Sequence, residues 1–332
     1  MPHRITLIPG DGIGPEVAEA TKTVLAATGV SLVWEEHDAG LAAIEKSGDA
    51  LPETTIESCR SNGVALKGPT TTPIGDGHVS ANVRLRRELD LYASVRPTKT
   101  IPGVDTPYRD VDLVVFRENT EGLYSGLENR VTDGVVLSIK VVTAQATDRI
   151  ARAAFEYAVK NGRKSVAAVH KANIMKLGDG LFLERVKQVA KEYPQIEYSE
   201  VIIDALCMRL VREPQKFDVL LMENLYGDIV SDLCSGLVGG LGVVPGANIG
   251  AEAAVFEAVH GSAPDIAGKG VANPLGLIKS AVLMLEHIGE LSASERLASA
   301  IDEAMTSGEA LTADLGGTAT TADVAAAIIK RL

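Results

Sequence analysis

The chain alternates between short apolar runs and longer stretches in which apolar residues recur at helical spacing. The first apolar run, 4–8, is followed by a glycine-rich turn and by helical spacing over 17–28. The same patterns predict strands at 31–36, 111–116, 166–169, 201–203 and 219–222, and helices at 150–160, 181–192, 275–287, 293–306 and 322–332. Strands that alternate with helices predict a largely parallel sheet covered by helices, and therefore an α/β fold.

One segment, residues 121–142, departs from this alternation. It contains several glycines and the run Val-Val-Leu-Ser-Ile-Lys-Val-Val, and it predicts a long β-hairpin. Because a long edge strand needs a partner, we interpret the hairpin as a dimerisation arm. An ordinary internal hairpin is the alternative.

Composition narrows the class of protein. With 332 residues, 46% of them hydrophobic, the chain can bury the cores of two domains, or of one domain with an inserted lobe. The formal net charge of -12 argues against nucleic acid as a partner, because phosphate binding needs clustered Lys and Arg. It does not exclude anionic substrates, since a few arginines can dominate one pocket.

The cysteines and the longest apolar stretches bear on localisation. Cys59, Cys207 and Cys234 are far apart in the sequence, which predicts reduced thiols in a reducing compartment. The apolar stretch near the start is too short for a signal sequence, and nothing later reaches transmembrane length. We therefore expect a cytoplasmic protein that has no membrane partner, with a processed organellar matrix protein as the alternative.

The segment Gly10-Asp-Gly-Ile-Gly14 follows a predicted strand and opens a predicted helix. A dinucleotide-binding fingerprint needs glycine at the first, third and sixth positions, whereas the sixth position here is Pro15. The spacing therefore departs from that fingerprint. Two interpretations stay open: a tight strand-to-helix turn, and a phosphate cradle at the helix N-terminus.

Three aspartates are candidate ligands for a metal ion. Asp228 and Asp232 follow the strand 219–222 and are four residues apart, so on a helix they share one face. Asp204 ends the predicted strand 201–203 and is a third candidate. Oxygen ligands suit Mg²⁺ or Mn²⁺ and not zinc. The alternative is a solvated acidic helix start.

Arginines are concentrated in one part of this acidic chain: Arg84, Arg86, Arg87, Arg96 and Arg117. Arg96 and Arg117 are placed at the ends of apolar runs, where α/β folds bind ligands. Guanidinium groups bind carboxylates through paired hydrogen bonds, so these side chains predict a pocket for a substrate with two or three carboxylates. We expect Arg84 and Arg87 to be surface salt-bridge partners instead.

Two further residues could move protons. Lys171 follows a buried-type strand, and a lysine at such a place can act as a proton shuttle. Tyr124 is a candidate phenolic acid. For each of them alone, a structural role is the usual alternative.

Eight segments, taken in order, resemble the isocitrate/isopropylmalate dehydrogenase family, and the resemblance covers essentially the whole chain. They are GDGIGPE (10–16), KGPTTTP (67–73), SANVRLRRELDLYASVRP (80–97), RENTEGLY (117–124), HKAN (170–173), NLYGDIVSD (224–232), GGLGVVPGANIG (239–250) and HGSAPDIAGKGVANP (260–274). The resemblance implies two α/β lobes that share a large mixed sheet, with a dimerising β-arm at about 121–142. The implied large, cofactor-binding domain comprises 1–97 and 248–332, and the small, dimerising and metal-binding domain comprises 98–247.

The resemblance also implies roles for single residues. The substrate-binding set would be Ser80, Asn82, Arg86, Arg96, Arg117, Tyr124, Lys171 and Asn173. Within this set Lys171 would assist deprotonation of the substrate hydroxyl, and Tyr124 would protonate the enol carbon. Mg²⁺ or Mn²⁺ would be bound by Asp204, Asp228 and Asp232. In this family Lys171 and Asp204 reach the site from the partner subunit, which implies a homodimer, or a higher oligomer, with shared active sites.

The cofactor would contact Thr71, Thr72, His260, Gly261, Ala263, Asp265, Ile266, Asn273 and Asp314. A carboxylate at Asp265 accepts a ribose 2′-hydroxyl and repels a 2′-phosphate. NADP-dependent relatives have Lys and Tyr in place of Asp265 and Ile266, and Tyr and Arg in place of Ala313 and Gly317. The resemblance therefore implies NAD as the cofactor.

The implied reaction is the oxidative decarboxylation of isocitrate, or of a closely related 2-hydroxy tri- or dicarboxylate. Relatives that act on isopropylmalate present an acidic and two leucine side chains on the helix that begins here at Ser80. Ser80, Asn82 and Val83 suit a third carboxylate better than an isopropyl group. Homoisocitrate and 3-isopropylmalate dehydrogenases are the alternatives within the family. A regulatory subunit without catalytic activity is the alternative of another class, and the intact set of site residues argues against it.

Overall fold

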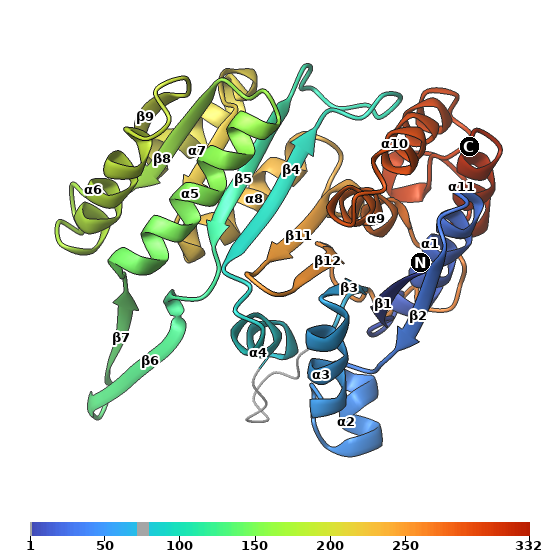
Figure 1. Ribbon diagram of the computed structural model, residues 1–332, viewed down its shortest axis with the longest axis horizontal. Coiled ribbons are helices and arrows are strands. Elements are labelled where there is room, and N and C mark those ends of the chain that lie inside the picture. Colours follow the sequence, from blue (N-terminus) through green and yellow to red (C-terminus); the bar gives the residue numbers. More distant parts are fainter. Residues whose placement is uncertain (1, 72–79) are drawn as a thin grey trace. The chain divides into compact units, whose positions relative to one another are not determined.

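The computed structural model describes residues 2–71 and 80–332 of the chain (Figure 1). These residues form two compact units. Unit 1 comprises Met1–Leu91, Thr100–Pro107 and Val238–Leu332, and unit 2 comprises Tyr92–Lys99 and Tyr108–Leu237. Within the described ranges no helix is long and apolar enough to cross a membrane.

Unit 1 is built on five strands in the order β2-β1-β3-β12-β11. The pairs are parallel except for β11 and β12, which are antiparallel. The strands are β1 (His3–Ile8), β2 (Leu32–Glu36), β3 (Val64–Lys67), β11 (Pro245–Ile249) and β12 (Ala254–Ala258). The apolar residues of β1 and β3 are buried, as expected for strands that helices cover.

Seven helices and two short 3-10 turns complete the described part of unit 1. The helices are α1 (Gly14–Ala27), α2 (Leu41–Ser47), α3 (Glu53–Asn62), α4 (Ala81–Glu88), α9 (Leu275–His287), α10 (Leu291–Thr306) and α11 (Thr321–Ile329), and the turns are η2 (Leu241–Val243) and η3 (Ala313–Leu315). Helix α9 packs on β11 and β12, α3 packs on β1 and β3, and α1 packs against α11. The loop 259–274 connects β12 to α9 and carries most of the predicted cofactor residues.

Unit 2 has five strands in the order β4-β5-β10-β8-β9, of which β4 and β5 are antiparallel and the remaining pairs are parallel. The strands are β4 (Ala93–Lys99), β5 (Asp112–Glu118), β8 (Ser165–His170), β9 (Glu197–Ile202) and β10 (Val219–Met222). The helices are α5 (Ala144–Lys160), α6 (Gly178–Ala190), α7 (Ile203–Arg212) and α8 (Asn224–Leu237), with the 3-10 turn η1 (Pro214–Lys216). Helix α5 packs against α6, and α7 packs against α8.

A separate two-stranded antiparallel sheet is formed by β6 (Gly122–Thr132) and β7 (Val135–Val141). Figure 1 shows this hairpin as a long projection from unit 2. Its apolar side chains are about half exposed, among them Leu127, Val131, Val136, Leu137 and Ile139. The predicted hairpin at 121–142 is therefore confirmed, and its apolar side chains form an exposed surface.

Two local predictions were wrong. Asp204 does not end a strand: β9 ends at Ile202, and Asp204 lies in the first turn of α7. Arg96 does not lie at the end of a strand either, although it ends an apolar run in the sequence, because it lies inside β4. In the first case a continuous apolar stretch could not show where extended backbone changes to helix, since short apolar runs fit both structures.

Candidate active site

Helix α8 carries two of the three predicted metal ligands, Asp228 and Asp232. They are one helical turn apart and therefore project from the same side of the helix. Burial raises the pKa of Asp232, and the negative charge of Asp228 raises it further, whereas Arg96 and Arg117 lower it. The negative charge of Asp228 and the positive charges of Arg96 and Arg117 thus act on the Asp232 carboxyl in opposite directions.

Arg117, near the end of β5, supplies part of that charge. Its side chain is 3% exposed, and its Nε and Nη2 atoms donate to Asn224 Oδ1 at 2.9 and 2.7 Å. Its Nη1 atom donates to Asp228 Oδ1. Asn224 begins α8, so the arginine holds the start of this helix against the strand.

Tyr124, on β6, donates its hydroxyl hydrogen to Asp228 Oδ2, and the Arg117 guanidinium lies 5.1 Å from the centre of its ring. Burial and the hydrogen bond to Asp228 raise the pKa of this phenol above its ordinary value. The phenol therefore keeps its proton at neutral pH. This is the state that a proton donor needs.

Arg96 lies on the same face of the sheet as Arg117. In the antiparallel ladder Ser94 is opposite Arg117 and Arg96 is opposite Val115, so both arginines project to one side. Arg96 is 4% exposed. Two buried guanidinium groups on one face, beside a phenol and two carboxylates, form a site suited to a small anion with several carboxylates.

Lys171 directly follows β8, and its ammonium group pairs with Asp204 of α7. This pairing lowers the pKa of the Asp204 carboxyl. The backbone N–H of Lys171 donates to Asp179 Oδ2 at 2.6 Å. Asn173, two residues further on, is exposed. The structure thus groups Lys171 with Asp204, and groups Asp228 with Tyr124 and Arg117.

The donor chemistry of the aspartates fits a hard divalent cation. Asp228 and Asp232 offer carboxylate oxygens from one side of a helix, which are the ligands that Mg²⁺ and Mn²⁺ prefer. Among residues 2–71 and 80–332 of a single chain, no three acidic, histidine or cysteine side chains come close enough to hold a metal ion. One chain therefore offers two carboxylates for such a site, and Asp204 belongs to a different group of side chains.

The predicted substrate residues of unit 1 lie at the start and end of α4. Ser80 precedes the helix, and Asn82 Oδ1 accepts a hydrogen bond from Thr70 Oγ1 at 3.0 Å. Arg86 Nη2 lies 3.3 Å from Glu257 Oε1. Arg84 pairs with Asp49 at 2.7 Å on the surface, as the sequence predicted for it.

Several predicted cofactor residues are linked by hydrogen bonds within unit 1. Asn273 Nδ2 donates to Asp314 Oδ2 at 3.0 Å, and Asn273 Oδ1 accepts from the backbone N–H of Leu275 at 3.0 Å. Thr71 Oγ1 and Ser262 Oγ lie 2.5 Å apart. Thr72 lies outside the described residues.

The remaining predicted cofactor residues occupy the loop 259–274. Asp265 and Gly261 are exposed, Ile266 is half-buried, and Ala263 has a φ of 38°. Burial lowers the pKa of His260, whose ring is therefore neutral at pH 7. Its Nε2 atom is buried and has no hydrogen-bond partner among the described residues, so a bound molecule could supply one.

The structure rejects a phosphate cradle at Gly10–Gly14. The backbone N–H groups of Asp11, Ile13 and Gly14 donate to the carbonyl oxygens of Pro69, Ser262 and Asp11, at 2.7, 2.8 and 2.9 Å. These donors would have to be free to bind phosphate. The segment is therefore a tight strand-to-helix turn.

A buried group of charged residues in unit 2 was not predicted. Lys140 of β7 donates to both Asp179 and Glu223, and the Tyr226 hydroxyl donates to Asp179 Oδ2 at 3.2 Å. Burial raises the pKa of Glu223 to about 7, although Lys140 favours its ionised form. No sequence pattern explained Glu223, because its partner Lys140 is distant in the chain.

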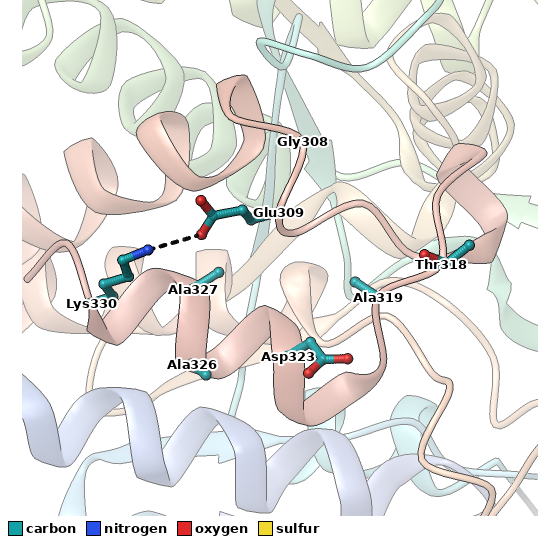
Figure 2. A pocket seen from close by; sticks show the side chains of 8 residues that line it. All are labelled: Gly308, Glu309, Thr318, Ala319, Asp323, Ala326, Ala327 and Lys330. Carbon is teal, nitrogen blue, oxygen red and sulfur yellow. Dashed lines mark ion pairs between the residues drawn. The ribbon is translucent and has the colours of Figure 1, made fainter.

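A pocket of about 460 Å³ in unit 1 is lined by residues of α11 and of the segments that flank it. Figure 2 shows these lining side chains. Glu309 and Lys330, which both line this pocket, form an ion pair at 3.6 Å. Asp323 completes the capping box at the start of α11. Because its charged groups bind each other and cap a helix, we assign this pocket no chemistry.

The fold and site thus define an α/β protein with a buried arginine and carboxylate centre, and comparison with known proteins identifies its family. The sequence profile of the isocitrate/isopropylmalate dehydrogenase family matches residues 4–328. The mitochondrial isocitrate dehydrogenase (NAD) catalytic subunit 5 of Arabidopsis thaliana is 54% identical over all of this chain and 89% of its own length. The chloroplastic 3-isopropylmalate dehydrogenase of Solanum tuberosum is 53% identical over 92% of this chain and 86% of its own length.

A solved structure supports membership of the same family. The crystal structure of isocitrate dehydrogenase from Methylococcus capsulatus superposes with a TM-score of 0.96 at 52% identity, over 99% of each chain. The chain belongs to the isocitrate/isopropylmalate dehydrogenase family. The predicted fold class, α/β with a large mixed sheet, is confirmed, and so is the predicted enzyme class, a dehydrogenase of this family.

Proposed function

We propose that the chain catalyses the NAD-dependent oxidative decarboxylation of isocitrate to 2-oxoglutarate and CO₂. The observation that carries this proposal is the pair of buried arginines, Arg96 and Arg117, on one face beside Tyr124 and the aspartates of α8. The general reaction agrees with the names of the relatives, of which one acts with NAD and one is an isocitrate dehydrogenase of known structure.

In the proposed mechanism the arginines bind substrate carboxylates, and Ser80, Asn82 and Arg86 contact the distal part of the substrate. Asp228 and Asp232, with Asp204 of the partner subunit, would hold Mg²⁺ or Mn²⁺. When bound, NAD accepts the hydride and the divalent cation acts as a Lewis acid. Lys171 assists removal of the proton from the substrate hydroxyl, while a hydride leaves the carbon atom that bears this hydroxyl.

Decarboxylation follows from the resulting β-keto acid. The bond to the leaving carboxylate breaks, CO₂ departs, and the electron pair forms an enolate. Tyr124 then donates its proton to the enol carbon, and its raised pKa supports this role because the phenol is protonated at neutral pH. Purified chain given isocitrate, NAD and Mg²⁺ should form NADH and 2-oxoglutarate one for one. NADH formation without 2-oxoglutarate would reject the proposed reaction.

We propose a homodimer in which Lys171 and Asp204 complete the site of the partner subunit. Within one chain these two residues pair with each other instead of joining Asp228 and Asp232. The exposed apolar side chains of the β6–β7 hairpin offer a surface that a second copy of the chain would cover. A dimer would therefore complete the metal site and bury the arm together.

NAD is the proposed nucleotide. Asp265 is exposed on the loop 259–274, where a carboxylate would repel a 2′-phosphate. A second observation concerns Gly317, the position at which NADP-dependent relatives have arginine. A Cβ atom at Gly317 would lie 2.0 Å from the carbonyl oxygen of Leu311, so the backbone here has no room for that side chain.

Exchanging Asp265 for Lys and Ile266 for Tyr together should raise the ratio of kcat/KM for NADP to that for NAD by about 10–100-fold, because the new side chains attract a 2′-phosphate. Steady-state kinetics with both nucleotides measure the ratio. Asp302→Lys, which reverses an exposed charge on α10, is the control and should leave the ratio unchanged. An unchanged ratio in the double variant would show that Asp265 does not select the nucleotide.

The substrate within the family is the finer part of the proposal. The relatives named above include an isocitrate and an isopropylmalate enzyme at almost equal identity, so identity does not separate the two substrates. Ser80 and Asn82 favour isocitrate, because an isopropyl group would leave their polar atoms unpaired. A regulatory subunit without activity is disfavoured, since the substrate arginines, Tyr124, Lys171 and the three aspartates are all present.

We propose that the protein functions in a reducing compartment, without specifying which one. Cys59, Cys207 and Cys234 are free thiols, and Cys59 and Cys234 are buried. Cytoplasmic localisation stays a prediction, since the isocitrate dehydrogenase relative from Arabidopsis thaliana is mitochondrial. Both the cytoplasm and an organellar matrix keep such thiols reduced.

A further inference from the structure

The segment Gly10–Glu16 contacts the predicted cofactor loop through both its side chains and its backbone. Glu16, in the first turn of α1, is the centre of these contacts. Its Oε2 atom accepts the backbone N–H groups of Gly268 and Gly270 at 3.1 and 3.3 Å. Its Oε1 atom accepts the N–H of Ala272 at 3.0 Å and the hydroxyl of Thr321 at 3.1 Å. One carboxylate thus ties three loop residues to α1.

The first part of the same loop is held by the backbone of the segment. Ile13 donates its N–H to the carbonyl oxygen of Ser262 at 2.8 Å. Gly12, with a φ of +60°, lies so close to this residue that a Cβ atom would be 2.0 Å from the Ser262 oxygen. Glycine is therefore required for the contact. The turn is hydrogen-bonded to the loop at Ser262, and Glu16 is hydrogen-bonded to the same loop at 268–272.

Asp11 extends the arrangement to Thr71, another predicted cofactor residue. Asp11 is buried, and its Oδ2 atom accepts the backbone N–H groups of Thr71 at 2.6 Å and Leu41 at 3.0 Å. Thr71 in turn contacts Ser262 through the two hydroxyl groups. The two predicted nucleotide-contacting segments are thus joined to each other and to one turn.

We propose that Glu16 is a positioning residue for NAD, acting through the loop 259–274 and assisted by Asp11 through Thr71. Glu16 itself does not touch the nucleotide. A carboxylate is needed because both of its oxygens accept hydrogen bonds from backbone or hydroxyl donors. An amide in its place would turn an NH₂ group toward such donors and would release part of the loop. The inference rests on the proposed cofactor site, because it explains how the segments that would contact NAD are held in place.

The test measures NADH affinity directly, by the change in nicotinamide fluorescence, for the wild-type dimer and for Glu16→Gln. We expect the Kd for NADH to rise about 10-fold in the variant, which is the effect of losing one or two charge-assisted hydrogen bonds that hold the loop. The KM for NAD should rise in parallel, while kcat at saturating NAD and the KM for isocitrate stay within about 3-fold. Glu19→Gln, on the same helix and paired with Lys22 at 2.9 Å on the surface, is the matched control and should bind NADH as the wild type does.

The outcomes separate the inference from the proposed function. If the wild type binds no NADH, the proposed cofactor is wrong. If the wild type binds NADH and Glu16→Gln binds it equally well, the positioning role is wrong. A rise in both KM values with a lower kcat would show a general loss of structure instead and would also overturn the role.

A second variant covers the case in which Glu16→Gln does not fold. Thr321→Val removes one donor to Glu16 and also the hydrogen bond from the Thr321 hydroxyl to the Ala272 carbonyl oxygen, 2.6 Å long. It should raise the Kd for NADH by about 2–5-fold. An unchanged Kd in a folded Thr321→Val protein would count against the positioning of the loop by this cluster.

Discussion

Exchange of Asp228 for asparagine is expected to lower kcat/KM for isocitrate by about 10³-fold or more. The side chain keeps its size, but the negative charge that would bind the cation is lost. Asp228 also accepts hydrogen bonds from Arg117 and Tyr124, so the change weakens the link between substrate binding and the proton donor. Steady-state kinetics at saturating Mn²⁺ measure the loss.

Cation affinity separates this explanation from a general loss of structure. Titration of Mn²⁺, followed by its paramagnetic resonance signal, should show at least about 10-fold weaker binding in Asp228→Asn. Glu192→Gln removes an exposed ion pair with Arg152 and is the control, because such surface pairs contribute little to stability. If Asp228→Asn retained the wild-type Mn²⁺ affinity and activity, Asp228 would not be a metal ligand.

Exchange of Lys171 for methionine is expected to lower kcat about 10²–10⁴-fold, which is the usual contribution of a positioned acid or base. The same substitution also tests whether the active site is shared between the two subunits of a dimer. A mixed dimer of one Lys171→Met chain and one Asp228→Asn chain, purified through two different tags, should regain about half the wild-type activity, because a shared arrangement leaves one of its two sites intact.

The matched control places both substitutions in one chain and pairs it with a wild-type chain. With shared sites, each site of this dimer contains one altered residue, so the dimer should be nearly inactive. If each site lay within one chain, the two results would be reversed: the first mixed dimer would stay inactive and the control would keep about half of the activity. The comparison therefore decides where Lys171 acts.

Much of the fold could be predicted because the hydrophobic pattern is unambiguous where elements are long. The predicted helix 275–287 coincides with α9, and the glycines and the β-type run within 121–142 predicted the β6–β7 hairpin. For Asp228 and Asp232 a helix was considered without a prediction of its bounds, and the structure places both residues on α8. Patterns of this kind depend only on neighbours in the sequence.

Features that depend on distant partners could not be predicted. Asp204 was assigned to a strand end, because the apolar residues before and after it fit a strand and a helix equally well. The burial of Glu223 beside Lys140, and the hydrogen bonds from the loop 259–274 to Glu16, join residues that are far apart in the sequence. The motif that contains Glu16 was recognised, but its contacts required the structure.

The central claim, an isocitrate-specific NAD enzyme, is tested most directly by comparing kcat/KM for isocitrate, homoisocitrate and 3-isopropylmalate under NAD and Mg²⁺. We predict that isocitrate is preferred over homoisocitrate by about 10-fold or more, the discrimination expected for one methylene group. Preference over 3-isopropylmalate should be larger, because Ser80 and Asn82 would lose a hydrogen-bonding partner. Best turnover with 3-isopropylmalate would contradict the account.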